Sequence, residues 1–272
     1  MKLCFSTLGC TEKSFEDILS LAKGYGIPAI EVRGVDGVLD NTAIKAFCPA
    51  ESENTARLLK QNNIVPIVLG TSCSFHNPEK FDKAIDEGVA CIKIAESLGF
   101  RYIRVFGDRL TADKQECIHR ITSGISHLCG ISQNVGVLLE VHGDFNTVES
   151  LSPIIDNMRG IENFGLIWDI EHTHKTYGDS FSEFYDFARP LIRHVHIKDY
   201  SDTENKLTLI GDGDVPIKKI VNRLLTDGYD GYLSLEWEKK WHPELPDITV
   251  ALDSFIKNLR EVESQWKPIK LF

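Results

Sequence analysis

Long apolar runs, CxxC pairs and an excess of basic residues are all missing from this sequence of 272 residues. No apolar stretch approaches the roughly 20 residues of a membrane span, and the N-terminal MKLCFSTLGC is too short in apolar residues for a signal peptide. The seven cysteines are odd in number and irregularly spaced, so we expect reduced thiols. The formal net charge of −10 disfavours a nucleic-acid surface. We therefore expect a soluble cytoplasmic protein with neither a membrane nor a nucleic acid as partner.

A glycine-rich phosphate loop is also missing after the first expected strand, where the sequence reads GCTEKS. Such a loop is typical of an open doubly wound sheet, the alternative fold. Eight apolar segments predict strands, at 3–8, 29–33, 64–71, 102–106, 135–141, 165–170, 192–198 and 232–238. Amphipathic segments between them predict helices, at 14–26, 51–63, 78–99, 111–133, 146–158, 180–190, 215–228 and 247–264. This alternation favours an α/β fold, a (β/α)8 TIM barrel forming one domain over residues 1–272.

Glu140, Asp169, His196 and Glu236 each lie at or near the end of an expected strand. In a parallel barrel the carboxyl ends of the last four strands meet at one mouth, so we expect these side chains to converge. Three carboxylates and one imidazole are suitable ligands for a divalent cation, and they are costly to bury unpaired. The sequence therefore predicts one metal site. Its oxygen-rich ligands favour Mn²⁺, with Mg²⁺, Co²⁺ or Zn²⁺ as alternatives.

Five more polar residues are expected near this mouth as substrate contacts. Each follows or flanks a strand end, where a side chain can turn towards the centre of the barrel. They are His76, Arg104, His142, His172 and Lys198. For Lys198 two roles stay open, pairing with a ligand carboxylate or holding an anionic substrate group. Arg104 is also the expected partner of Glu31, because charged groups inside a barrel usually pair.

Other residues near the strand ends have simpler expected roles. His194 is expected to be a hydrogen-bonded core histidine, and His174 to be solvated. Trp237 and Trp241 either form an apolar wall against a sugar ring or pack in the core. The acidic stretch 200–214 is expected to be a loop.

Seven segments carry a resemblance to a known family. In chain order they read SCSFHN, RVFG, LLEVHGDF, WDIEHTH, HVHIKD, GDGDVP and LSLEWE. With them the chain resembles the sugar isomerase/epimerase superfamily of xylose isomerase-like TIM barrels, whose members include ketose 3-epimerases, inosose dehydratase and endonuclease IV. The resemblance implies a divalent metal held by Glu140, Asp169, His196 and Glu236. It also implies that Glu140 and Glu236 move protons at opposite faces of a substrate carbon, and that His172 touches substrate.

This resemblance allows more than one reaction. A carbonyl polarised by a metal acidifies the neighbouring hydrogen, which one carboxylate removes and a second returns, as in an isomerase or epimerase. Loss of a β-hydroxyl from the same enediolate makes an inosose dehydratase-like lyase. The expected substrate is a free sugar, polyol or keto-inositol, because the loops lack a glycine-rich phosphate cradle. Asn146 and Asp202 stand where ketose 3-epimerases carry a glutamate and an arginine, so their substrate is not carried over.

Two other functions stay open. An endonuclease IV-like phosphodiesterase needs several metal ions and a basic surface, which the net charge of −10 disfavours. A non-catalytic sugar- or metal-binding barrel needs no bases on two faces, so Glu140 and Glu236 argue against it. The oligomeric state stays open, a homo-oligomer included.

Overall fold

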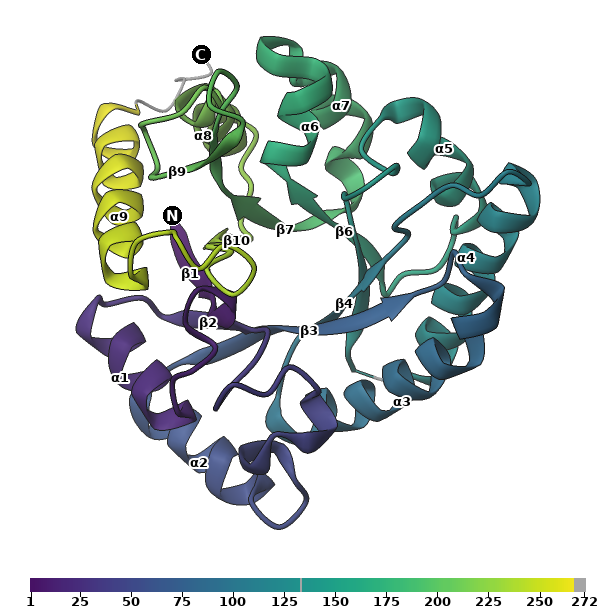
Figure 1. Cartoon of the computed structure of the whole chain (residues 1–272), viewed down its shortest axis with the longest axis horizontal. Coiled ribbons are helices and arrows are strands. Elements are labelled where there is room, and N and C mark those ends of the chain that lie inside the picture. The colour runs from purple at the N-terminus through teal and green to yellow at the C-terminus, as the bar shows by residue number, and fades with distance from the viewer. Residues whose placement is uncertain (133, 267–272) are drawn as a thin grey trace, which may run out of the picture.

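Eight parallel strands close into a barrel in the computed structural model, which describes residues 1–132 and 134–266. Strands adjacent in the chain are adjacent in the ring, and the last strand pairs with the first (Figure 1). The strands are β1 (Lys2–Ser6), β2 (Ala29–Val32), β3 (Val65–Ser74), β4 (Tyr102–Phe106), β5 (Gly136–Glu140), β6 (Phe164–Asp169), β7 (Ile192–Ile197) and β10 (Tyr232–Leu235). Each predicted strand overlaps one of them, so the predicted TIM barrel is confirmed.

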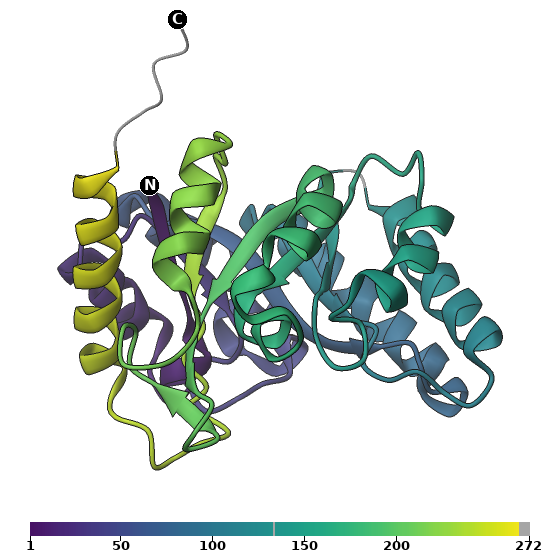
Figure 2. The same ribbon diagram turned by 90° about the horizontal axis from the view of Figure 1, so that it is seen from above.

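Helices surround this ring on the outside (Figures 1 and 2). They are α1 (Phe15–Gly24), α2 (Ser52–Asn62), α3 (Phe81–Leu98), α4 (Lys114–Ile131), α5 (Val148–Asn157), α6 (Ile170–Tyr177), α7 (Ser182–Ala188), α8 (Ile217–Thr226) and α9 (Ile248–Gln265). Apolar residues on their inner faces, such as Phe255 of α9, pack with outward-facing strand residues such as Trp168 in one core. Ser14 begins α1 with the expected capping contact, since its Oγ accepts the N–H of Asp17 at 3.1 Å.

The chain between β6 and β7 differs from the prediction, because α6 begins directly at the end of β6. Asp169 is the N-cap residue of α6, and its Oδ1 accepts the N–H groups of Glu171 at 3.0 Å and His172 at 3.3 Å. No helix was predicted for residues 170–177, because the sequence carries no turn signal between the strand and the helix. The consequence is that α6 holds His172 above the barrel mouth.

The acidic stretch after β7 is also more ordered than expected. Here β8 (Asp199–Ser201) and β9 (Lys206–Thr208) form an antiparallel pair. The buried carboxylate of Asp199 accepts the N–H groups of Gly211 at 2.7 Å and Gly213 at 3.1 Å, which holds the returning loop.

Three smaller points concern the other expectations. All seven cysteines are free. Gln133, the last residue of the predicted helix 111–133, lies outside the described residues. No helix in residues 1–132 and 134–266 combines the length and the apolar character that crossing a membrane requires.

Candidate metal centre and active site

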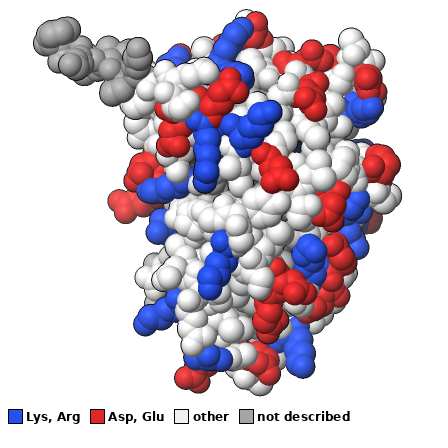
Figure 3. Space-filling model, turned by 90° about the vertical axis from the view of Figure 1, so that its left-hand side faces the viewer, with Lys and Arg blue, Asp and Glu red and all other residues white. Residues whose placement is uncertain are grey.

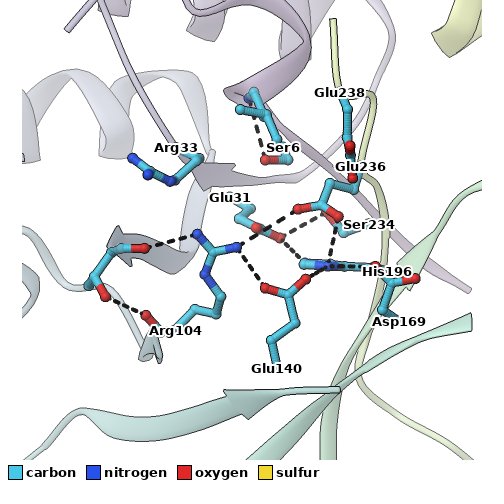
Figure 4. Close-up of polar contacts among 12 residues, drawn as sticks. Ser6, Glu31, Arg33, Arg104, Glu140, Asp169, His196, Ser234, Glu236 and Glu238 are labelled. Atoms are coloured by element: carbon cyan, nitrogen blue, oxygen red, sulfur yellow. Dashed lines mark hydrogen bonds and ion pairs between the residues drawn. The ribbon is translucent and has the colours of Figure 1, made fainter. Parts of the chain in front are cut away.

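The four predicted ligands come together at the mouth of the barrel (Figure 4). Glu140 and Asp169 end β5 and β6, His196 lies in β7 opposite Asp169, and Glu236 follows β10. One ligand atom from each lies within 4.8 Å of those of the other three. Each residue is at most 3% exposed to solvent. Strand pairing thus places one imidazole and three carboxylates in a single buried cluster.

His196 is the centre of this cluster. Its Nδ1 lies 3.1 Å from Oε1 of Glu140, 3.2 Å from Oε2 of Glu236 and 3.9 Å from Oδ2 of Asp169. Burial by itself lowers the pKa of this imidazole, but the surrounding carboxylates outweigh it and raise the pKa well above its usual value. The nitrogen therefore stands where a cation is favoured.

Lys198 takes the first of its two expected roles and pairs with the cluster. Its Nζ lies 2.7 Å from Oδ2 of Asp169, 2.9 Å from Oε2 of Glu236 and 2.6 Å from Oε1 of Glu238. Burial opposes the charge, yet these carboxylates raise the pKa of Lys198 well above its usual value. Lys198 is thus a permanent cation inside the site. Sequence reasoning missed Glu238, although its two-residue spacing from Glu236 places both on one strand face.

Arg104 does not form the expected pair with Glu31. Its Nη1 lies 2.7 Å from Oε2 of Glu140 and 4.0 Å from Oε1 of Glu236, while its Nη2 donates to the carbonyl of Thr71 at 3.1 Å. Burial would raise the pKa of Glu140, but Arg104 is the strongest of the groups that together hold it at about 2. Arg104 and Glu140 lie on the adjacent strands β4 and β5, two residues apart in register, and the long side chain of Arg104 spans this offset.

Glu31 instead lies beneath the cluster as an acceptor for two histidines. Its Oε2 accepts hydrogen bonds from Nε2 of His194 at 3.0 Å, Nε2 of His196 at 2.9 Å and Oγ of Ser234 at 3.2 Å. Burial raises the pKa of this carboxyl, but the two histidines outweigh it and hold the pKa below its usual range. The expected hydrogen-bonded role of His194 is thereby confirmed. The role of Glu31 was missed because no local pattern links β2 to β7.

A cavity of about 160 Å³ opens above the cluster. Its lining includes both candidate bases and two of the expected substrate contacts, Glu140, Glu236, Arg104 and His142. A second cavity of about 400 Å³ shares His142 and Glu238 with it and is lined by His172. The ring centroids of His142 and His172 are 4.2 Å apart. Burial and the nearby Lys198 lower the pKa of His172 to about 3, so this imidazole is neutral.

Two histidines lie elsewhere than expected. His76 lines neither cavity; its Nδ1 lies 2.8 Å from Oγ of Ser74 and 3.5 Å from Oδ2 of Asp108. The expectation of a solvated His174 is wrong, since this residue is 9% exposed and its Nε2 lies 3.1 Å from Oδ2 of Asp202. Asp202 lines neither of the two cavities.

The two tryptophans after β10 have different surroundings. Trp237 is buried in the core, and its Nε1 donates to the carbonyl of Pro246 at 2.9 Å. Trp241 is 52% exposed and lines the smaller cavity. Only Trp241 is therefore placed to act as an apolar wall.

The cluster fits a divalent cation by its chemistry. Three carboxylate oxygens and one imidazole nitrogen within 4.8 Å of one another form a donor set that hard and borderline metal ions accept. Among the described residues, five carboxylates share the ion pairs of this cluster with three cationic groups, Arg104, Lys198 and the imidazole of His196; the carboxylates are those of Glu31, Glu140, Asp169, Glu236 and Glu238. A bound cation would offset the remaining negative charge.

Known proteins share the fold of this chain, and a family model matches its sequence. Solved structures with the same fold include the probable 3-DHS dehydratase AsbF from Bacillus anthracis, at 20% identity and a TM-score of 0.74 over 94% of this chain and 99% of that one. The IolI protein with a bound zinc atom is 20% identical, with a TM-score of 0.78 over 98% of this chain and 99% of that one. A D-tagatose 3-epimerase-like protein is 19% identical, with a TM-score of 0.75 over 97% and 99%.

A sequence relative is the uncharacterized protein MJ1311 of Methanocaldococcus jannaschii. It is 28% identical over 123 residues, which span 42% of this chain and 41% of the relative. Residues 19–259 match the sequence model of the family described as xylose isomerase-like TIM barrel. The chain belongs to the xylose isomerase-like TIM barrel family.

Proposed function

We propose that the protein is a divalent-metal-dependent isomerase or epimerase of a small sugar, polyol or keto-inositol. One observation carries this proposal. The carboxylates of Glu140 and Glu236 both contact Nδ1 of His196, at 3.1 and 3.2 Å, and both line the same cavity. A site that only bound sugar would have no need for two buried bases facing one space.

In the proposed site the metal is held by Glu140, Asp169, His196 and Glu236. When bound, the ion supplies Lewis acidity that polarises a substrate carbonyl and acidifies the adjacent hydrogen. We take Mn²⁺ as the preferred ion, with Mg²⁺, Co²⁺ and Zn²⁺ as alternatives, because the donor set is rich in oxygen.

The proton transfers fall to Glu140 and Glu236. One carboxylate removes the hydrogen next to the carbonyl and gives an enediolate. The other, which first takes a proton from a water molecule, returns that proton from the opposite side, which inverts the carbon in an epimerase; the first carboxylate then releases its proton to solvent. Return of the proton at the neighbouring carbon gives an isomerase. Arg104 keeps Glu140 charged and directed into the cavity by its 2.7 Å ion pair.

Substrate orientation falls to His142, His172 and Trp241. The rings of His142 and His172 meet edge to face where the two cavities adjoin, and each offers a ring nitrogen to a hydroxyl. Trp241 borders the same space with an exposed aromatic face. Lys198 is buried among Asp169, Glu236 and Glu238, so it organises the carboxylates and does not bind substrate.

A lyase is the second candidate, favoured by one observation. Asp202 is bound to His174 at 3.1 Å, so the substrate contact that ketose 3-epimerases make from this position is lacking. Loss of a β-hydroxyl from the same enediolate needs no such contact. An endonuclease has less support. His76 lies away from the cluster, and basic and acidic side chains are interspersed on the face in Figure 3.

The proposal is tested by hydrogen exchange with solvent. Mn²⁺-loaded protein is incubated in D₂O with fructose, tagatose, psicose, xylulose and 2-keto-myo-inositol, and each sugar is examined by mass spectrometry and proton NMR. We expect deuterium next to the carbonyl of at least one ketose, with a new epimer, isomer or dehydrated product. Protein treated with a chelator is the control. No exchange into any member would reject proton-transfer chemistry on these substrates.

A further inference from the structure

Arg33 is a buried cation without an ion-pair partner in the described part of the chain. It directly follows β2, is 7% exposed and lines the same cavity as Glu140 and Glu236. Its guanidinium donates to the carbonyl of Leu39 at 3.0 Å and to Oγ of Ser72 at 2.9 Å, both neutral acceptors. Figure 4 places Arg33 at the edge of the carboxylate cluster, with no contact drawn to a carboxylate. Buried charges are normally paired, so this one is exceptional.

The nearby acidic groups are engaged elsewhere. Glu87 is the acidic residue that most raises the pKa of Arg33, but its carboxylate accepts the backbone N–H of Ser72 at 2.6 Å. Glu140 is paired with Arg104 at 2.7 Å. The pKa of Arg33 is lowered to about 10, mainly by burial and secondly by the charge of the nearby Arg104. Glu87 and Glu140 thus act on Arg33 from a distance, and no carboxylate of the described residues lies within ion-pair distance of its guanidinium.

A second guanidinium lies beside Arg33 because residue 70 is glycine. A Cβ at Gly70 would lie 2.8 Å from Cδ of Arg33 and 3.3 Å from Nη2 of Arg104. The missing side chain lets both arginines line one wall of the cavity. Because Arg104 is paired with Glu140, Arg33 supplies the unpaired positive charge of this wall.

We propose that Arg33 binds an anionic group of the substrate, so that the substrate is a ketose or cyclic keto-polyol bearing a carboxylate or a phosphate. This inference rests on the proposed function of the same cavity. The substrate would place its carbonyl and hydroxyl over the carboxylate cluster and its anion against Arg33. A guanidinium presents paired N–H donors that match both anions. Lys198, the other candidate for this role, is already bound by three carboxylates.

The test uses sugars that differ only at their last carbon. D-fructose, D-fructuronate and D-fructose 6-phosphate share C1 to C5, as do D-tagatose, D-tagaturonate and D-tagatose 6-phosphate. Their binding to the Mn²⁺-loaded protein is measured by titration calorimetry. We expect one charged member to bind roughly tenfold or more tighter than its neutral sugar, as a charged hydrogen bond predicts. The charged member that does so shows whether the anion is a carboxylate or a phosphate. Equal or weaker binding of all charged members, absent binding included, would overturn the inference.

Variants separate the charge from the fold. Arg33→Gln should bring the charged and the neutral sugar to similar affinity, whereas Arg33→Lys should keep part of the preference. Arg120→Gln is the matched control, because Arg120 also donates to a carbonyl, that of His76, but does not line the cavity. Retention of the full preference in a folded Arg33→Gln protein would overturn the inference. If Arg33→Gln does not fold, the preference of the unaltered protein and of Arg33→Lys decides.

The binding preference for charged sugars is measured independently of deuterium exchange, so the two proposals can fail separately. A charge preference that depends on Arg33, without deuterium exchange into any sugar, would reject the proposed function and support the anion site. Exchange into neutral ketoses, with no preference for their charged counterparts, would support the proposed function and overturn the anion site.

Discussion

Nε2 of His196 donates a 2.9 Å hydrogen bond to Oε2 of Glu31 below the candidate metal centre. An ionised carboxylate only accepts hydrogen bonds, so Nε2 carries a hydrogen, which leaves Nδ1, the nitrogen facing Glu140 and Glu236, as the one that would bind a metal ion in place of a proton. Protein imidazoles that bind metals are commonly oriented by such a carboxylate. Glu31 therefore fixes Nδ1 of His196 as the nitrogen of the proposed metal site.

Glu31→Gln should weaken Mn²⁺ binding by about 10- to 100-fold, the usual effect of losing a partner of a metal-binding histidine. The amide can retain a hydrogen bond but loses the charge that holds the ring. Mn²⁺ affinity is measured by electron paramagnetic resonance of the free ion. Ser234→Ala is the control, because the Ser234 hydroxyl donates to the same carboxylate oxygen at 3.2 Å and not to a proposed ligand. Equal affinities of Glu31→Gln and the unaltered protein would contradict this role.

Mn²⁺ should bind at about one ion per chain and raise the melting temperature. Binding only to the folded state stabilises it by about 2.7 kcal/mol when the free ion is 100-fold above its dissociation constant. Asp169→Asn should lose most of this effect, because Asp169 is a buried proposed ligand with its Oδ2 3.9 Å from Nδ1 of His196. Calorimetric titration and thermal melting check both points. A protein whose melting does not respond to Mn²⁺, Mg²⁺, Co²⁺ or Zn²⁺ would refute the metal centre.

Lys198→Met should destabilise the metal-free protein by about 3–5 kcal/mol, because it leaves buried carboxylates without their cation. Added Mn²⁺ should recover more stability in this variant than in the unaltered protein, since the ion offsets the same charges. Urea unfolding with and without Mn²⁺ measures the effect. Lys206→Met is the matched control, because its ion pair with Glu204 is exposed and worth about 0–1 kcal/mol. Similar losses for the two variants would argue against the role of Lys198.

Glu140→Gln and Glu236→Gln should each lower deuterium exchange by about 10²- to 10⁴-fold, the range expected for a lost acid or base. Both residues are also proposed ligands, so exchange is measured at saturating Mn²⁺. Asp169→Asn is the comparison, because Asp169 is proposed to hold the ion without moving a proton. Once saturated with Mn²⁺, the Asp169→Asn protein should retain more deuterium exchange than either glutamate variant. An equal loss in all three would assign Glu140 and Glu236 to metal binding alone.

His172 should make the metal-free protein lose stability in mild acid. Burial lowers its pKa in the folded protein from 6.5 to about 3. The unfolded chain therefore takes up a proton between pH 6.5 and 3 that the folded chain does not, and the free energy of unfolding falls with falling pH by at most about 1.4 kcal/mol per unit. Urea unfolding across this range should give a shallower dependence for His172→Gln. Parallel curves for the two proteins would show that His172 does not titrate in this way.

The sequence by itself determined the barrel and the level of its candidate site. Strands buried on both faces read as apolar runs, and amphipathic helices separate them, so the alternation predicts a closed parallel sheet. Because the carboxyl ends of parallel strands share one mouth, Glu140, Asp169, His196 and Glu236 were predicted to meet there. Strand period also placed Lys198 on the same face as His196.

Only the tertiary structure decided which charges pair. Glu31 lies nearer in the chain to Arg104 than to His196, yet it bonds His196 across the barrel, while Arg104 pairs with Glu140 on the adjacent strand. Strand register and side-chain length set these contacts, and neither is encoded in a local pattern. The same holds for Arg33, whose missing counter-charge is visible only when every neighbour around it is in place. Sequence determines which groups reach the mouth of the barrel, and packing decides which of them remain unpaired.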